Sequence, residues 1–224
     1  MGQTPQATSN SQSITTSAYQ DATATPHEVA IQNTNPQPPS EPLSLWYTTP
    51  ATNWVREALP IGNGDMGAMI LGGVAQDRIQ FNHKTLWKGT SNPTDLGSYL
   101  PFGDIYITNL NAKNATNYRR CLNLCTAVAD VQYDADGECY TREYLCSNPD
   151  KVVAIRYKAK HARNLSLSIN LINAQGLRAT YTTKGATFSG TLTNGMAYAA
   201  TMRVCHKAGR VTATSEGIEI DRAK

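Results

Sequence analysis

Carboxylates are the residues in this chain whose chemistry is easiest to define, because two of them held across a substrate can act as acid and base in hydrolysis. No Gly-x-Ser-x-Gly or His-Glu-x-x-His motif occurs in the 224 residues, so no serine nucleophile or zinc-protease helix is indicated. The spacing of the carboxylates singles out no pair, and we expect most of them to face solvent. The candidates are Glu57, Asp65, Asp77, Asp104, Asp130, Glu138 and Glu143.

A glycine-rich segment, Gly62-Asn-Gly-Asp-Met-Gly67, matches Gly-x-Gly-x-x-Gly. A dinucleotide site would also need a helix at the end of the motif and an acidic residue about 20 positions later. The next residues include the pair Gly72 and Gly73, which opposes a helix, and the distant position falls near Asn82 and His83. We therefore predict no cofactor, and we interpret Asn63 and Gly64 as a type I′ turn between two strands.

The cysteines and histidines do not form a metal-ligand pattern. The cysteine pairs are Cys121-x₃-Cys125 and Cys139-x₆-Cys146, and the second spacing is too wide for the usual zinc pairs. The four histidines are scattered along the chain. We predict no metal site and reduced structural thiols, with Cys121 and Cys125 on one face of a strand.

Three tryptophans, Trp46, Trp54 and Trp87, lie close together in the sequence. An exposed indole can stack on a sugar ring, whereas a buried one fills a core or a contact between domains. Packing in the core or between domains is the favoured interpretation, and sugar stacking stays open as the alternative.

The segments that must position these residues have the period of β-strands. Residues 165–171 alternate apolar and polar side chains, and residues 127–133 and 152–157 are rich in β-branched and aromatic types. Turn sequences separate these runs, and no window shows sustained helical periodicity. The pattern predicts an all-β fold, a large antiparallel β-sandwich of about ten to thirteen strands.

Composition divides the chain at residue 42. Residues 1–42 are rich in Ser, Thr, Gln, Asn, Ala and Pro, which predicts a disordered tail before a β-sandwich domain at 43–224. The whole chain has 20 Lys and Arg residues against 17 Asp and Glu residues. This small positive charge is too dispersed to indicate nucleic-acid binding. The sequence has no run of 18 apolar residues and therefore predicts no membrane-spanning helix. Its first residues show no secretory signal.

The chain ends on residues 217–224, which begin another strand pattern. We expect this strand to present an unpaired edge, which would indicate a truncated domain.

Several ordered blocks of the sequence resemble the N-terminal domain of glycoside hydrolase family 95, the α-L-fucosidases. The similarity covers about residues 43–175. The blocks are Leu45-Trp-Tyr-Thr-Thr-Pro-Ala51, Trp54-x-x-Glu-Ala-Leu-Pro-Ile-Gly-Asn-Gly-Asp-Met-Gly67 with its continuation to Val74, Arg78-Ile-Gln-Phe-Asn-His-Lys-Thr-Leu-Trp-Lys-Gly89, Tyr99-x-x-Phe-Gly-Asp-Ile-Tyr-Ile107, Tyr118-Arg-Arg-x-Leu-Asn-Leu124, Thr126-Ala-Val128, Tyr140-Thr-Arg-Glu143 and Ser147-x-Pro-Asp150.

The resemblance implies a super-β-sandwich that precedes an (α/α)₆ barrel in an exported enzyme that removes terminal α-L-fucose with inversion. In the family, the catalytic residues belong to the barrel, for which this chain has no room, so none is carried over. One block departs from the family, because Asn82-His-Lys replaces Asn-Glu-Asp and removes an acidic pair.

The resemblance implies that this chain is a non-catalytic domain that packs against and supports a catalytic barrel. Our hypothesis is that Trp87 with Trp46 or Trp54 forms the surface that contacts the barrel, with Asn82 as a further candidate. An alternative is a freestanding carbohydrate-binding sandwich that uses the exposed aromatics, with fucosylated glycans as partners. A third option is a complete small hydrolase with an unrecognised carboxylate pair.

Overall fold

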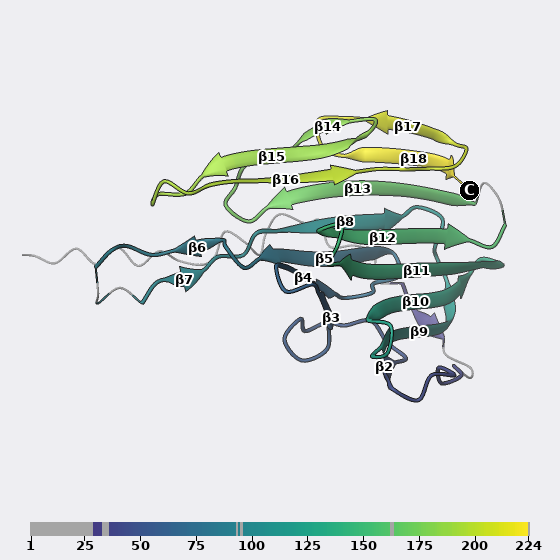
Figure 1. Cartoon of the computed structure of the whole chain (residues 1–224). Coiled ribbons are helices and arrows are strands. Elements are labelled where there is room, and N and C mark those ends of the chain that lie inside the picture. Colours follow the sequence, from purple (N-terminus) through teal and green to yellow (C-terminus); the bar gives the residue numbers. More distant parts are fainter. Residues whose placement is uncertain (1–28, 33–35, 93, 95, 162–163, 224) are drawn as a thin grey trace, which may run out of the picture.

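The computed structural model describes residues 29–32, 36–92, 94, 96–161 and 164–223. All regular elements in these residues are strands, most of them in two large sheets (Figure 1). Sheet A contains β1 (Ile31–Gln32), β2 (Ser44–Tyr47), β9 (Ala115–Asn123), β10 (Val128–Ala135), β11 (Glu138–Ser147) and β12 (Val152–Ala159). Sheet B contains β3 (Leu59–Gly62), β4 (Met66–Ile70), β5 (Gln76–His83), β8 (Gly103–Asn109), β13 (Leu165–Asn173), β17 (Arg210–Ala213) and β18 (Ile218–Ala223).

Two small sheets complete the described part. One contains β14 (Thr180–Thr182), β15 (Gly185–Thr191) and β16 (Ala197–Arg203), and the other is the pair β6 (Trp87–Lys88) and β7 (Ser98–Tyr99). The described residues therefore form 18 strands, more than the ten to thirteen predicted. The excess comes from strands of two to four residues. Such strands are too short to show an alternation of apolar and polar residues in the sequence, and some of their partners lie in distant segments.

Sheets A and B pack face to face, and the prediction of an all-β sandwich is confirmed. The order in sheet A is β1-β9-β10-β11-β12, with β2 also paired to β9, and the order in sheet B is β17-β18-β13-β8-β5-β4-β3. Strand β3 contacts β9, β10 and β11, while β4 contacts β11 and β12. Among the described residues, all pairings in these two sheets are antiparallel except that of β1 with β9.

Alternation of side chains explains this arrangement. In β11, every second residue from Glu138 to Tyr144 is buried, and in β13 the apolar members of the 165–171 alternation are buried. Because successive side chains of a strand point to opposite faces, each sheet turns one apolar face toward the other. The buried apolar residues of both sheets form one core cluster.

The structure differs from two expectations about the chain ends. Of the predicted disordered tail, residues 1–28 lie outside the described residues, but Ile31 and Gln32 form β1 against Ala115 and Thr116. At the other end, β18 pairs with both β13 and β17. The expected unpaired edge was therefore wrong, because the short strand β17 covers it.

Candidate functional site

The three tryptophans are at least partly exposed, so none of them is part of the core. The exposed fractions are 38% for Trp46, 49% for Trp54 and 37% for Trp87. The structure does not bring all three together, because β6, which carries Trp87, lies far from β2, which carries Trp46 (Figure 1). The tryptophans must therefore be considered as separate surfaces.

Trp87 lies on a hairpin, β6–β7, that projects from the sandwich (Figure 1). Its ring contacts Tyr99 edge to face, with 4.9 Å between centroids, and its Nε1 and ring edge lie against the backbone of Gly89 and Gly97. The side-chain amide of Asn194 donates to the Trp87 carbonyl oxygen at 3.1 Å. The indole is held by local contacts, yet much of its surface is open.

The neighbouring residues anchor this hairpin to the sandwich. Leu86 is buried, and the backbone N–H of Leu100 donates to its carbonyl oxygen. Asn82 lies near the end of β5, half-buried and paired with Gly67, and its side-chain oxygen accepts from the next backbone N–H at 2.8 Å. Asn82 thus serves the local backbone in this structure.

Trp54 lies on a single turn fixed by two side chains. The oxygen of Asn53 accepts from the N–H groups of Val55 and Arg56, and Glu57 accepts from those of Thr52 and Asn53. These backbone hydrogen bonds lower the pKa of Glu57. The turn holds Trp54 and its exposed neighbour Val55 away from the core.

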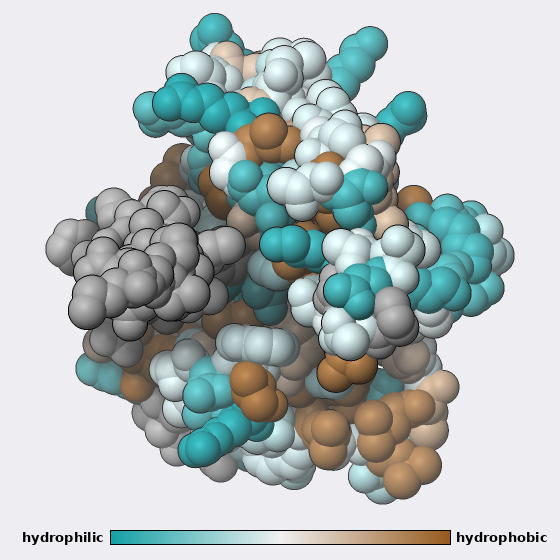
Figure 2. Space-filling view, turned by 90° about the vertical axis from the view of Figure 1, so that its left-hand side faces the viewer, coloured by the Kyte–Doolittle hydropathy of each residue, from teal (hydrophilic) through white to brown (hydrophobic). Residues whose placement is uncertain are grey.

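Figure 2 shows the side of the molecule from which the hairpin projects. Apolar residues, in brown, gather on the lower part of this face, at the height of β2 and β3 in Figure 1. Large exposed apolar patches mark sites of contact with other protein surfaces. Large hydrophobic residues exposed in the hairpin, in β2 and in the segments around it are Leu43, Leu45, Trp46, Tyr47, Trp54, Val55, Trp87, Leu96, Tyr99 and Leu124.

The carboxylates are less exposed than the sequence suggested. Asp77, Asp104 and Glu138 are buried, which corrects the expectation that such groups face solvent. Tyr144 and Tyr157 both donate to one oxygen of Asp77, the latter at 2.8 Å, and the N–H of Gly72 donates to the other oxygen at 2.9 Å. Asp77 is therefore fully engaged inside the sandwich.

Arg142 completes this interior network. Its guanidinium lies 3.8 Å from Asp77, donates to the carbonyl oxygens of Gly73 and Val74, and donates to the hydroxyl of Tyr133 at 2.7 Å. Burial and the nearby Asp77 carboxylate raise the pKa of Tyr144, which stays a hydroxyl. The network ties the β4–β5 connection of sheet B to sheet A, which is a structural role.

The other buried carboxylates have partners of their own. Asp104 receives two hydrogen bonds from Arg78, at 2.9 and 3.2 Å. Glu138 accepts from the N–H groups of Cys139 and His161 at 3.0 Å and from the Asn164 amide at 2.8 Å. Burial opposes the charge of Glu138, but these hydrogen bonds leave its pKa lowered.

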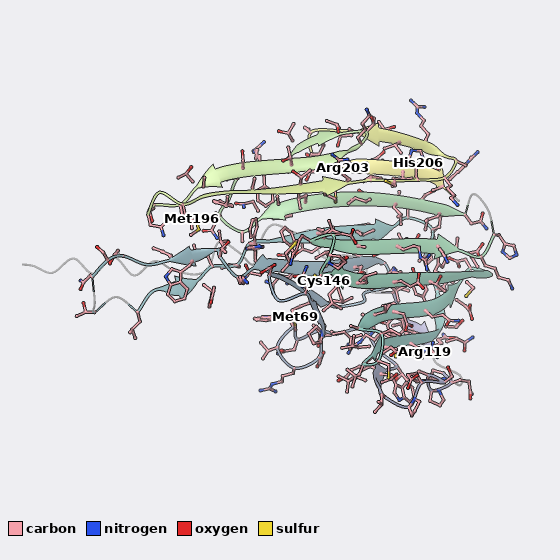
Figure 3. The ribbon with its side chains drawn as sticks, in the orientation of Figure 1. Met69, Arg119, Cys146, Met196, Arg203 and His206 are labelled. Carbon is pink, nitrogen blue, oxygen red and sulfur yellow. The ribbon has the colours of Figure 1, made fainter. Side chains whose placement is uncertain are left out.

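Asp130 and Glu143 are the carboxylates that the structure brings side by side. They are register partners on β10 and β11 and point to the outer face of sheet A. A groove of about 290 Å³ lies over them. Figure 3 places Arg119, which lines the same groove, on β9 in the lower part of the molecule, away from the β6–β7 hairpin.

Smaller predictions about turns and thiols are also resolved. Gly64 has a φ of 90°, whereas Asn63 is not among the described residues with positive φ, so the turn is not of type I′. The side-chain oxygen of Asn63 accepts from the N–H groups of Asp65 and Met66 instead. Cys121 is buried in β9, but Cys125 is exposed in the following turn, so the two do not share a strand face.

The five cysteines are free. In the part of the chain that the structure describes, no three His, Cys, Asp or Glu side chains are grouped to hold a metal ion, and no helix is long and apolar enough to cross a bilayer.

Comparison with known proteins identifies the family of this chain. A sequence model of the family described as "Glycosyl hydrolase family 65, N-terminal domain" matches residues 45–96 and 90–224. The chain belongs to this family. Recognition of the chain as the N-terminal domain of a glycosyl hydrolase is thereby confirmed, although the matched family carries the number 65 and the resemblance pointed to family 95.

Curated relatives agree with the fucosidase part of the resemblance. The chain is 29% identical over 170 residues to alpha-L-fucosidase 2 of Arabidopsis thaliana, covering 58% of the chain and 20% of the relative. It is 27% identical over 155 residues to a probable alpha-fucosidase A of Aspergillus niger, covering 50% and 19%. The corresponding protein of Aspergillus oryzae is 25% identical over 164 residues, covering 55% and 22%. The chain spans about a fifth of the length of these relatives.

Proposed function

We propose that this domain is non-catalytic and supports the catalytic part of an α-L-fucosidase-like glycoside hydrolase by packing against it. The observation that carries the proposal is the match to an N-terminal-domain family, together with much longer relatives named alpha-fucosidases, of which the matched segment covers about a fifth. In this proposal, the reaction is hydrolysis of terminal α-L-fucosyl residues, and its catalytic groups lie in an (α/α)₆ barrel outside these residues.

The β6–β7 hairpin is the contact that we assign to the catalytic part. A two-stranded hairpin alone has marginal stability in water, and each strand here has only two residues. Its exposed Trp87 and Tyr99, with Leu96 at 88% exposure, offer apolar surface that a second domain would bury. The apolar residues lower on the same face in Figure 2 extend this surface.

The three buried carboxylates support the non-catalytic part of the proposal. A general acid or base needs a carboxylate that can reach a substrate and exchange a proton. Asp77, Asp104 and Glu138 are instead buried and used as hydrogen-bond acceptors within the fold.

Two experiments test this function. The chain alone should release no nitrophenol from 4-nitrophenyl α-L-fucoside, and turnover by the purified chain would overturn the proposal and favour a small hydrolase. In the second experiment, residues 45–224 replace the matching N-terminal segment of the Arabidopsis alpha-L-fucosidase 2. We expect this chimera to hydrolyse the fucoside, and Trp87→Ala should lower its melting temperature by several degrees.

The hairpin variant needs a matched control. Leu110→Ala removes an exposed apolar side chain that follows β8, outside the surface assigned to the catalytic part, so it reports the cost of losing any exposed apolar side chain. Trp87→Ala should leave the melting temperature of the chain alone nearly unchanged, because the hairpin contributes little to the stability of the sandwich. An equal loss of melting temperature in the chain and the chimera would contradict the assigned contact.

A further inference from the structure

The outer face of sheet A carries a continuous row of chemically distinct side chains. The backbone register pairs Trp46 with Cys121, Cys121 with Asp130, Asp130 with Glu143, and Glu143 with Arg156. Register partners on neighbouring strands point to the same face, about 4.8 Å apart. The row therefore runs from an exposed indole on β2, across two carboxylates, to a guanidinium on β12.

A second row of polar side chains lies beside the first. Arg119 pairs with Gln132 on β10, and Gln132 pairs with Thr141 on β11. These three residues, with Asp130 and Glu143, line the groove of about 290 Å³. Arg119 also donates to the carbonyl oxygen of Gln37, at 3.3 Å, which ties this arginine to the segment before β2.

The two carboxylates in the groove are an unfavourable pair for the fold alone. Like charges directly opposite each other destabilise a sheet. Arg119 lies 3.8 Å from Asp130, and Arg156 forms an ion pair with Glu143, so the four charges balance. Burial raises the pKa of Asp130. The Arg119 guanidinium lowers this pKa and the Glu143 carboxylate raises it, and the net shift is upward.

The groove also contains an unused donor. The buried Nε of Arg119 has no hydrogen-bond partner in the structure. A buried donor without a partner costs about 1–3 kcal/mol, and because this Nε is inaccessible to solvent, a ligand oxygen would reach it only after the Arg119 side chain turns toward the groove. This observation is independent of the carboxylate pair and concerns a residue that lines the same groove.

We propose that this groove on sheet A, between Arg119, Asp130 and Glu143, binds a neutral saccharide. Each sugar hydroxyl both donates and accepts hydrogen bonds, which suits a surface that alternates carboxylates, guanidinium groups and the Gln132 amide. The balanced charge disfavours a strongly ionic ligand. Trp46, about two strand spacings from Asp130, gives a flat apolar surface for the C–H face of a sugar ring.

This inference does not depend on the hairpin contact. The groove lies on the outer face of sheet A, whereas the proposed contact with a catalytic part lies on the projecting hairpin (Figure 3). A catalytic part that packs against the hairpin leaves the groove open, so the groove can hold a glycan near a glycosidase.

The test is a titration of the full chain with 2′-fucosyllactose, lactose and cellobiose, followed by calorimetry and by backbone amide NMR shifts. We expect saturable binding of at least one of these sugars with a Kd on the order of 1 mM, with the largest shifts in β9, β10 and β11. Asp130→Asn and Glu143→Gln should each weaken binding by about tenfold or more, because a charged hydrogen bond is lost.

The control variants separate binding from folding. Glu219→Gln changes an exposed strand carboxylate on sheet B and should bind as the unmodified chain does. Asp130→Asn should melt at the same temperature or higher, because it removes the like-charge pair. Trp46→Ala should weaken binding, whereas Trp54→Ala should not.

Several results would overturn the proposal. These are no binding of the three sugars at about 50 times the expected Kd, unchanged affinity in both carboxylate variants, or shifts confined to the hairpin. Groove shifts caused by calcium chloride or sodium phosphate but by none of the sugars would also reject it. Failure of the fucosidase chimera would leave these measurements unaffected.

Discussion

At the scale of single residues, the centre of the sandwich is filled by arginine and tyrosine as well as aliphatic side chains. Arg120 and Arg142 are each 1% exposed, and Tyr118, Tyr133 and Tyr144 are fully buried. Arg120 donates to the carbonyl oxygens of Thr49 and Glu57 and stacks on Tyr47, which fixes the segment that carries Trp54. The core therefore positions loops as well as burying apolar surface.

Asp77→Asn tests the interior network. The change removes the carboxylate that faces the buried guanidinium of Arg142, and breaking such a pair costs about 3–5 kcal/mol. We expect the free energy of unfolding to fall by about 3 kcal/mol, with an unchanged denaturant slope in urea.

Asp221→Asn is the comparison for this variant, because its pair with Arg222 is exposed. Exposed pairs contribute about 0–1 kcal/mol, so this variant should unfold near the original midpoint. Equal effects of the two variants would show that the Asp77 carboxylate does not stabilise the interior.

Asp65 gives a prediction for pH dependence. Hydrogen bonds and ion pairs from Lys151 and Lys84 lower its pKa from 3.8 to about 2. Because the folded-state pKa is lowered, the stabilisation is complete above the unfolded value and is lost as the pH falls from about 4 toward 2.

An NMR titration of the Asp65 carboxyl carbon measures this pKa directly. Replacing both lysines by methionine should move the midpoint back toward 3.8. A midpoint near 3.8 in the unmodified chain would contradict the contacts of this turn with Lys84 and Lys151.

At the scale of elements, strands follow from sequence where one face is buried along several residues. The alternation at 165–171 predicted β13. Asp136 and Gly137, both with positive φ, form the tight turn between β10 and β11. Strands β1, β6 and β7 have two residues each, too few for a period, so only their distant partners define them.

Gly97→Ala tests how the hairpin holds its indole. At Gly97, with φ at +64°, a Cβ would lie 2.3 Å from Cζ2 of Trp87. Gly137→Ala is the matched control, because its φ is +81° and no atom lies within 4 Å of the new Cβ. Both changes cost about 1–2 kcal/mol for the left-handed backbone.

Only the change at position 97 should also move the indole. In a background with Trp46 and Trp54 replaced by Phe, acrylamide should quench the fluorescence of Trp87 more strongly after Gly97→Ala. Gly137→Ala should leave the quenching as it is in the background without either glycine change. Unchanged quenching in both variants would contradict the packing of the hairpin.

At the scale of the whole molecule, sequence proximity was a poor guide to the candidate site. Trp46, Trp54 and Trp87 lie within 42 residues, yet the first belongs to the edge of sheet A and the last to a separate hairpin. Asp130 and Glu143 were visible as carboxylates, but only the β10–β11 register makes them partners. In this hairpin the register is fixed by the two-residue turn at Asp136 and Gly137, so the pairing follows only once the exact position of the turn is known.

The exposed face in Figure 2 predicts the behaviour of the isolated chain. In the proposed function a catalytic part covers these apolar side chains, so for the isolated chain we expect weak self-association that increases with concentration. Val55→Glu together with Leu96→Glu places two charges on side chains that are 69% and 88% exposed. Sedimentation velocity should then show a monomer at concentrations where the unmodified chain forms dimers or larger species.

Leu110→Glu is the control for this prediction, because Leu110 is also exposed but follows β8, which ends on the opposite side of the molecule from the hairpin (Figure 1). Charge alone raises solubility, so this single change should leave most of the association in place if the apolar face causes it. If Leu110→Glu abolishes association as fully as the double variant, net charge is the cause and the face in Figure 2 is not the contact. A monomer at all concentrations in the unmodified chain would show that this surface needs no cover.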